Sequence, residues 1–375
     1  MTVLARLRSL WLDVHLWIGA GLLIVLAPLG VTGSVLVWHD PIDRALHAQR
    51  YATSGPTASR PLDDYVRAAQ AAFAGRAQLT QIRMPQEPGD PVVAVGRMAG
   101  SGGGGRPQTI NAWIDPPTAR VLDTAETAKG FMMIMHRVHG TLMIPEVGRK
   151  VVGWLGWAMF VSCATGLWLW WPRRGGFVKG LRWTRGDTTM FNLHHMVGFW
   201  ICIPLAVLSL TGVYISFPQT SRALFGIPSP PPRAGGPGGR FAPPLAQPRM
   251  SFGDAAAAAL AAAPGELAEI NAPTRGRDPS WRVGLRTPGA ERPATIQVAD
   301  ATGDVRLPRP GAEPRREGGP DPVSRLMRQV HDGGGLGIVW QTVIFVAGLA
   351  PALLGITGVV MWLRRRERRR RLAEA

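Results

Sequence analysis

Cysteine is scarce in this chain, since its 375 residues include only Cys163 and Cys202, both inside long apolar runs. Two such cysteines supply neither a disulfide framework nor a thiolate metal site. The sequence also lacks HExxH, a Walker pattern, a glycine-rich nucleotide loop after a strand and a local Ser/His/Asp signature. These absences leave the common hydrolase and nucleotide-binding chemistries without support.

Charge is missing from four stretches that contain no Asp, Glu, Lys or Arg. Each is near or above the ~20 residues that a helix needs to cross a bilayer. The first is longer than the apolar part of a secretory signal, and no small-x-small cleavage site follows it, so we expect it to be retained. The predicted transmembrane helices are 15–38, 151–171, 193–217 and 336–363.

The net charge of +17 is concentrated in the short segments 1–14, 172–191 and 364–375, which together hold 14 Lys/Arg and 4 Asp/Glu. By the positive-inside rule, both termini and the middle loop face the cytoplasm. We interpret the Arg-rich tail as a stop-transfer signal and anionic-lipid anchor, not as a nucleic-acid site. The cytoplasmic regions are then the N-terminus 1–14, the basic loop 172–192 and the tail 364–375. The two periplasmic connections are 39–150 and 218–335.

Each long connection has the pattern of a small α+β module. A helix with Pro and Asp residues in its first turn precedes three strand-like stretches in the first connection, and the second connection repeats this order. Two Pro/Gly/Arg-rich segments read as poorly ordered linkers. The predicted elements are helices 61–73 and 251–263, strands 78–84, 91–98, 109–114, 267–271, 281–286 and 294–298, and linkers 228–248 and 308–322.

Histidines recur at matched positions in the two halves of the chain. His15 and His194 are each followed by Gly after four residues and by a Thr-Gly pair after seventeen, and His139 and His331 each precede a Thr-Gly pair by twenty-six. The predicted fold is therefore a membrane α-helical protein with four transmembrane helices in two parallel repeats and two periplasmic α+β modules. We expect the Thr-Gly pairs and nearby glycines to serve close helix packing.

The four matched histidines indicate haem ligation, because neutral imidazoles from two facing helices hold one haem iron between them. Depth in the membrane pairs His15 with His194 near the cytoplasmic side and His139 with His331 near the outer side. A glycine one turn after His15 and His194 would leave room for a macrocycle. Two stacked haems would conduct electrons across the bilayer.

His195 and His136 have no counterpart in the other half of the chain. They remain alternative axial ligands, haem-propionate contacts or proton relays. The unmatched His39 and His47 are interpreted as surface residues. The abundant tryptophans are most simply an interfacial belt.

The pattern resembles the PepSY-associated transmembrane family, in particular iron-uptake proteins proposed to be inner-membrane ferrisiderophore reductases. The Asp-Pro-Pro-Thr and Asp-Ala-Thr-Gly turns lie in segments similar to PepSY domains. The resemblance implies two b-type haems bound by transmembrane histidines and electron transfer to a periplasmic Fe(III)-siderophore. The segments that carry it are 15–19, 32–33, 167–173, 193–198, 210–212, 355–365 and the turns 115–118 and 300–303.

We therefore predict a bacterial inner-membrane di-haem oxidoreductase that acts as a ferric-siderophore reductase. The sequence shows no soluble nucleotide- or flavin-binding domain, so its electrons must come from a cytoplasmic reductase or a quinol. The alternative is a non-enzymatic membrane sensor or assembly factor whose modules bind a periplasmic partner or restrain a protease.

Overall fold

The computed structural model describes residues 3–99, 107–172, 176–227, 242–289, 293–307 and 321–374. The chain divides into two compact units, one helical and one built around a β-sheet. The helical unit comprises Met1–His39, Ile134–Ser229 and Pro320–Ala375, and the sheet unit comprises Asp40–Met133 and Pro230–Gly319.

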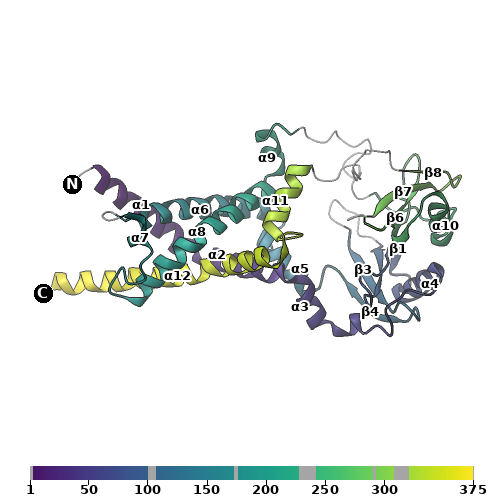
Figure 1. Ribbon diagram of the computed structural model, residues 1–375, viewed down its shortest axis with the longest axis horizontal. Helices are drawn as coiled ribbons and strands as arrows, with labels where there is room; N and C mark the ends of the chain where they lie inside the picture. Colours follow the sequence, from purple (N-terminus) through teal and green to yellow (C-terminus); the bar gives the residue numbers. More distant parts are fainter. Residues whose placement is uncertain are drawn as a thin grey trace. The chain divides into compact units, whose positions relative to one another are not determined.

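Three helices of the helical unit, α6, α8 and α12, are each long and apolar enough to cross a membrane. They cover all but one terminal residue of each of the predicted spans 151–171, 193–217 and 336–363. α12 continues as one helix through the Arg-rich tail, and its end lies at the same end of the unit as the start of α1 (Figure 1). The helices are α1 (Val3–Gly21), α2 (Leu23–Val37), α5 (Phe131–Thr141), α6 (Gly148–Trp170), α7 (Gly176–Gly180), α8 (Thr189–Ser216), α9 (Pro218–Leu224), α11 (Pro322–Asp332) and α12 (Gly337–Glu374).

The first predicted span, 15–38, is not one straight helix. It consists of the end of α1 and all of α2, which meet at Leu22 with a bend of 66°. Gly19 and Gly21 weaken the helix just before the bend, and Pro28, six residues after Leu22, removes a backbone donor inside α2. Kinks of this size arise at such residues.

Small residues bring the spans into close contact, as predicted. A Cβ on Gly348 of α12 would lie 2.2 Å from the Ser34 Oγ and 2.7 Å from the Gly30 carbonyl oxygen of α2. Ser34 donates a 2.8 Å hydrogen bond to the carbonyl oxygen of Phe345. Between α6 and α8, a Cβ on Gly156 would lie 2.9 Å from Val213. Only glycine permits these approaches.

The sheet unit contains one antiparallel sheet of eight strands among the described residues, in the order β4-β3-β2-β1-β5-β6-β7-β8. The two predicted modules therefore share a single sheet, with β1 paired to β5. Fully buried Ile82 and Ile270 face each other across that junction. The elements are α3 (His39–Leu46), the 3-10 helix η1 (Ala48–Tyr51), α4 (Leu62–Phe73), β1 (Ala77–Arg83), β2 (Val92–Met98), β3 (Thr109–Ile114), β4 (Val121–Glu126), α10 (Phe252–Ala262), β5 (Glu266–Asn271), β6 (Ser280–Arg286), β7 (Ala294–Ala299) and β8 (Val305–Arg306).

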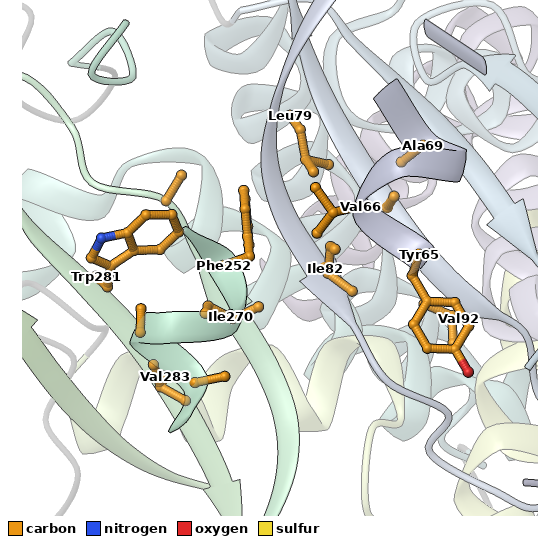
Figure 2. Close-up of a cluster of buried hydrophobic side chains, with 14 of the residues drawn as sticks. Tyr65, Val66, Ala69, Leu79, Ile82, Val92, Phe252, Ile270, Trp281 and Val283 are labelled. Atoms are coloured by element: carbon orange, nitrogen blue, oxygen red, sulfur yellow. The ribbon is translucent and has the colours of Figure 1, made fainter. Parts of the chain in front are cut away.

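Helices α4 and α10 contribute to one apolar core with the sheet (Figure 2). Phe252 of α10 packs edge-on against Trp281 of β6, with ring centroids 4.8 Å apart. Phe73 of α4 lies over Gly96 of β2, where a Cβ would come within 2.7 Å of the ring. The predicted helices 61–73 and 251–263 match α4 and α10 to within a residue. The observed helices begin one residue later because Pro61 and Ser251 are their N-caps.

The two Asp turns of the resemblance are structural. Asp115 is fully buried and accepts hydrogen bonds from the Ser54 backbone N–H at 2.7 Å and from its hydroxyl at 2.6 Å. Asp300 accepts from the indole N–H of Trp281 at 2.9 Å and from the backbone N–H of Arg249 at 3.0 Å. Asp115 thus ties the segment before α4 to the turn between β3 and β4. Asp300 ties the segment before α10 to the turn between β7 and β8.

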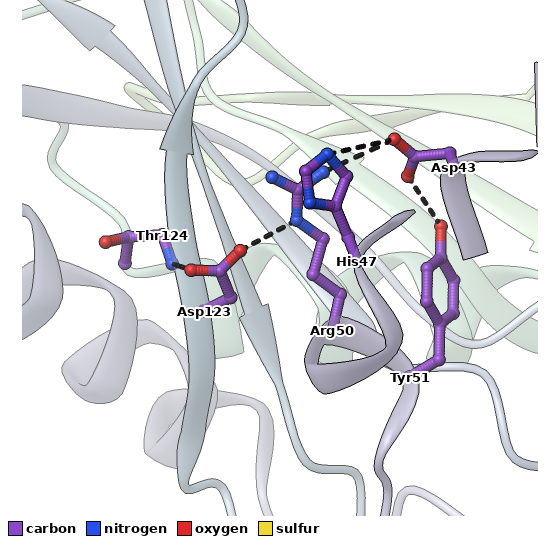
Figure 3. A network of polar contacts seen from close by, with 6 residues as sticks. All are labelled: Asp43, His47, Arg50, Tyr51, Asp123 and Thr124. Atoms are coloured by element: carbon purple, nitrogen blue, oxygen red, sulfur yellow. Dashed lines mark hydrogen bonds and ion pairs between the residues drawn. The ribbon is translucent and has the colours of Figure 1, made fainter. Parts of the chain in front are cut away.

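A polar network attaches α3 and η1 to the sheet (Figure 3). Arg50, only 8% exposed, donates to Asp123 at 2.7 Å and to Asp43 at 3.4 Å, and it stacks 4.1 Å from the ring centroid of Trp113. Tyr51 donates to Asp43 at 3.1 Å. The network fixes the segment that follows α2 against β3 and β4.

The predicted linkers fall mainly outside the described residues. The described parts, 242–248 and 321–322, are ordered, contrary to the prediction. Asp321 is the N-cap of α11 and Pro322 is its first residue. The segment 242–248 is held by hydrogen bonds to the sheet unit. Leu245 donates its backbone N–H to the Pro273 carbonyl oxygen at 2.8 Å, and Gln78 donates to the Leu245 carbonyl oxygen at 2.6 Å.

Candidate histidine-pair sites in the helical unit

The first candidate site joins His15 of α1 and His194 of α8. Their ring centroids are 6.3 Å apart and their planes are perpendicular. His15 Nδ1 lies 3.1 Å from both the Ser162 carbonyl oxygen and the Thr165 hydroxyl of α6. His194 Nδ1 lies 2.9 Å from the Thr357 hydroxyl of α12. The pair is therefore held by four different helices.

The second candidate site joins His139 of α5 and His331 of α11, whose ring centroids are 6.0 Å apart with planes at 43°. His139 Nδ1 lies 2.8 Å from the Leu29 carbonyl oxygen of α2. His331 Nδ1 lies 3.0 Å from the Thr211 hydroxyl of α8. The structure thus brings together the two pairs that depth suggests from sequence, while their role as ligands stays a prediction.

The hydrogen bonds define which nitrogen carries the proton. The Thr165 hydroxyl donates to the Val161 carbonyl oxygen at 2.9 Å, and Thr211 and Thr357 donate in the same way to Val207 and Leu353. A hydroxyl whose proton is used in this way, like a carbonyl, accepts from the imidazole. Nδ1 is therefore protonated in all four histidines, and Nε2 keeps the lone pair that a metal ion needs.

Each Thr-Gly pair lies against one histidine through its glycine, and three of the four threonines also contact that histidine, which the sequence interpretation missed. The four threonines are at most 7% exposed. The glycine after each threonine lies against an imidazole, so that an added Cβ would approach a ring Cε1 at short distance. These distances are 2.6 Å for Gly33 and His139, 3.0 Å for Gly166 and His15, 3.1 Å for Gly212 and His331, and 3.5 Å for Gly358 and His194. The constant spacing between histidines and Thr-Gly pairs was the available signal for this role.

The donor set fits haem better than a metal ion held by protein alone. The ring centroids of the two pairs, 6.3 and 6.0 Å apart, are close enough for both imidazoles of a pair to reach one metal at about 2 Å each. The described residues contain no group of three or more His, Cys, Asp or Glu side chains that could hold a metal ion. A structural zinc site needs four protein ligands, whereas haem iron takes only its axial ligands from the protein.

The glycines one turn after the histidines of the first pair border open space. A Cβ on Gly19, one turn after His15, would meet nothing within 4 Å, and a Cβ on Gly198, one turn after His194, would meet only Leu354, at 3.9 Å. These are the two glycines that the sequence interpretation assigns to a macrocycle.

The two unmatched histidines occupy different surroundings. His195 lies between the stacked rings of Phe191 and Trp170, with centroids 5.5 and 5.9 Å away. Its Nε2 accepts a hydrogen bond from Arg185, so its lone pair is already engaged. His136 is an exposed side chain of α5. The engaged lone pair of His195 favours a supporting role over axial ligation, and the role of His136 stays a prediction.

Comparison with known proteins identifies the family. No curated protein matches the chain. A family model described as the PepSY-associated TM region matches residues 12–365, which include all four predicted spans and both halves of the sheet. The match confirms the family resemblance found in the sequence, and the chain belongs to the PepSY-associated transmembrane family.

Proposed function

We propose that this membrane protein is a di-haem b oxidoreductase of the bacterial inner membrane, with both termini in the cytoplasm, that passes electrons to a periplasmic Fe(III)-siderophore. The observation that carries the proposal is the presence of two histidine pairs, 6.3 and 6.0 Å between ring centroids, each formed by two different helices. The donor is a cytoplasmic reductase or a quinol.

The residues of the chain would hold and tune the cofactors. His15 and His194 would ligate one haem, and His139 and His331 the other. When bound, haem iron alternates between ferric and ferrous states and so exchanges single electrons. The hydroxyls and carbonyl oxygens at Nδ1 keep the imidazoles neutral and oriented, a contribution that raises ligand basicity.

The spacing of the two pairs supports transfer across a bilayer. His194 and Thr211, which contacts His331, are both on α8 and are seventeen residues apart. This corresponds to about 26 Å of helix, close to the ~30 Å thickness of the hydrocarbon core. One electron delivered to Fe(III) yields Fe(II), whose lower charge weakens its attraction to anionic siderophore oxygens.

Reconstituted vesicles test this function. Haem-loaded protein with a reductant enclosed on the α12 C-terminal side should reduce an external Fe(III)-hydroxamate, detected with a ferrous-iron chelator. His194→Ala and His331→Ala should each stop the reaction, whereas His47→Ala, a histidine of the sheet unit, should not. Haem-loaded wild-type protein that leaves Fe(III)-siderophore unreduced would refute the acceptor. A protein that binds no haem would instead favour the sensor alternative.

A further inference from the structure

Arg185, in the loop before α8, presents a fixed guanidinium beside the first histidine pair. Its Nη1 donates to the Trp170 carbonyl oxygen at 2.9 Å, to the Gly180 carbonyl oxygen at 3.5 Å and to His195 Nε2. All three acceptors are neutral, because an imidazole nitrogen that accepts a hydrogen bond carries no proton. These bonds orient the cation without compensating its charge.

The other edge of the guanidinium has no partner in the described part of the chain. Neither Nε nor Nη2 makes a hydrogen bond there, and Arg185 forms no ion pair with any described Asp or Glu. The side chain is half-buried. Even a half-buried cation loses part of its hydration, which a paired anion would replace. The two parallel N–H groups of this edge match the two oxygens of a carboxylate.

Trp170 supplies a second donor in the same cluster. Only 3% of this residue is exposed, and its indole Nε1 is buried without a hydrogen-bond partner among the described residues. Its ring stacks on Phe199 at 4.0 Å and lies 5.8 Å from the Arg185 guanidinium. An unsatisfied buried donor next to a cation that no described carboxylate compensates offers two donors to one acceptor.

The cluster lies at the level of the His15–His194 pair. His195, which Arg185 contacts, directly follows His194 on α8. Trp170 stands five residues beyond Thr165, which contacts His15, or about 7.5 Å along α6. Arg185 therefore lies at about the same level along α6 and α8 as the histidine pair.

We infer that the Nε–Nη2 edge of Arg185 binds a carboxylate of the group held by His15 and His194, namely a propionate of haem. The inference rests on the proposed function and adds a binding residue that no repeat or motif indicates. A phosphate of an acidic phospholipid is the other anion with matching oxygens, and the test separates the two sources.

The test compares haem with its dimethyl ester, which has no carboxylate. In full-length His331→Ala protein, which retains the first pair, competition binding should favour haem over the ester by roughly 10- to 100-fold. Arg185→Gln should abolish that preference, and Arg185→Lys, which keeps the charge but not the two-pronged edge, should retain part of it. Arg182→Gln, an exposed arginine of the same loop, is the control and should change nothing.

An unchanged preference for haem in Arg185→Gln would overturn the inference while leaving the proposed function intact. If Arg185→Gln keeps its preference for haem over the ester but loses a co-purified acidic phospholipid, the inference is also overturned, because the Nε–Nη2 edge then binds lipid phosphate. If no variant, nor the wild-type chain, binds haem, the proposed function fails and this inference fails with it.

Discussion

Gly33 is the position where one added methyl group should disturb a candidate ligand most. In Gly33→Ala, the new Cβ would lie 2.6 Å from Cε1 and 2.9 Å from Nδ1 of His139. Ordinary contact between carbon atoms begins at about 3.5 Å. The imidazole would therefore have to retreat by about 1 Å, unless α2 itself moves.

The expected cost follows from this displacement. Inserting a methyl group into a filled space costs about 1–3 kcal/mol, which corresponds to roughly 5- to 150-fold in affinity. A shift of about 1 Å is also half of a nitrogen–metal bond of about 2 Å. Gly33→Ala should therefore weaken or remove the haem at the His139–His331 pair and spare the other.

Gly358→Ala is the matched control. It lies in the equivalent Thr-Gly pair against His194, but its Cβ would be 3.5 Å from the ring, which is normal contact. The assay is haem content per chain, with reduced-minus-oxidised spectra and redox titration for both variants. Full retention of both haems in Gly33→Ala, or greater loss in Gly358→Ala, would refute the assignment of these glycines to the imidazoles.

Three further outcomes are expected. Thr357→Val removes the acceptor of His194 Nδ1, so redox titration should show the midpoint potential of one haem raised by on the order of 40 mV, while Thr357→Ser leaves it unchanged. Burial alone would raise the pKa of Asp115, but hydrogen bonds from Ser54 and Thr118 outweigh burial and lower it. The ionised carboxylate therefore stabilises the folded state. This contribution is present above the unfolded pKa of about 3.9 and is lost as pH falls through the folded pKa. In thermal unfolding, Asp115→Asn should thus cost about 1–3 kcal/mol at pH 7, with a gap from wild type that narrows below about pH 4. Ile82→Ala and Ile270→Ala should each lower the free energy of unfolding of the sheet unit by about 2–5 kcal/mol, measured with denaturant. The double variant should lose less than the sum of the two, because the residues face each other. Strict additivity would argue against the shared sheet.

The histidine pairing could be predicted because repetition carries three-dimensional information. The same spacing around His15 and His194, and around His139 and His331, places each member at a matching depth, and depth then selects its partner. Arg185 has no such counterpart. Its importance depends on three acceptors that are scattered along the chain, at positions 170, 180 and 195, and only folding brings them together.

Other features could not be predicted because different structures share their local pattern. A buried Thr-Gly pair has the same sequence whether the glycine faces a helix or an imidazole. β1 and β5 each read as an ordinary strand, and their pairing joins segments almost 190 residues apart. The bend at Leu22 lies inside an uncharged run that has the composition of a continuous span.

The most direct test of the central claim is the number of haems per chain in the wild type and in single histidine variants. We predict two b-type haems in the wild-type protein, one in His194→Ala and one, with a different potential, in His331→Ala. The His194→Ala/His331→Ala double variant should bind none. A colourless wild-type protein from haem-replete cells, or loss of the same haem from both single variants, would contradict the account.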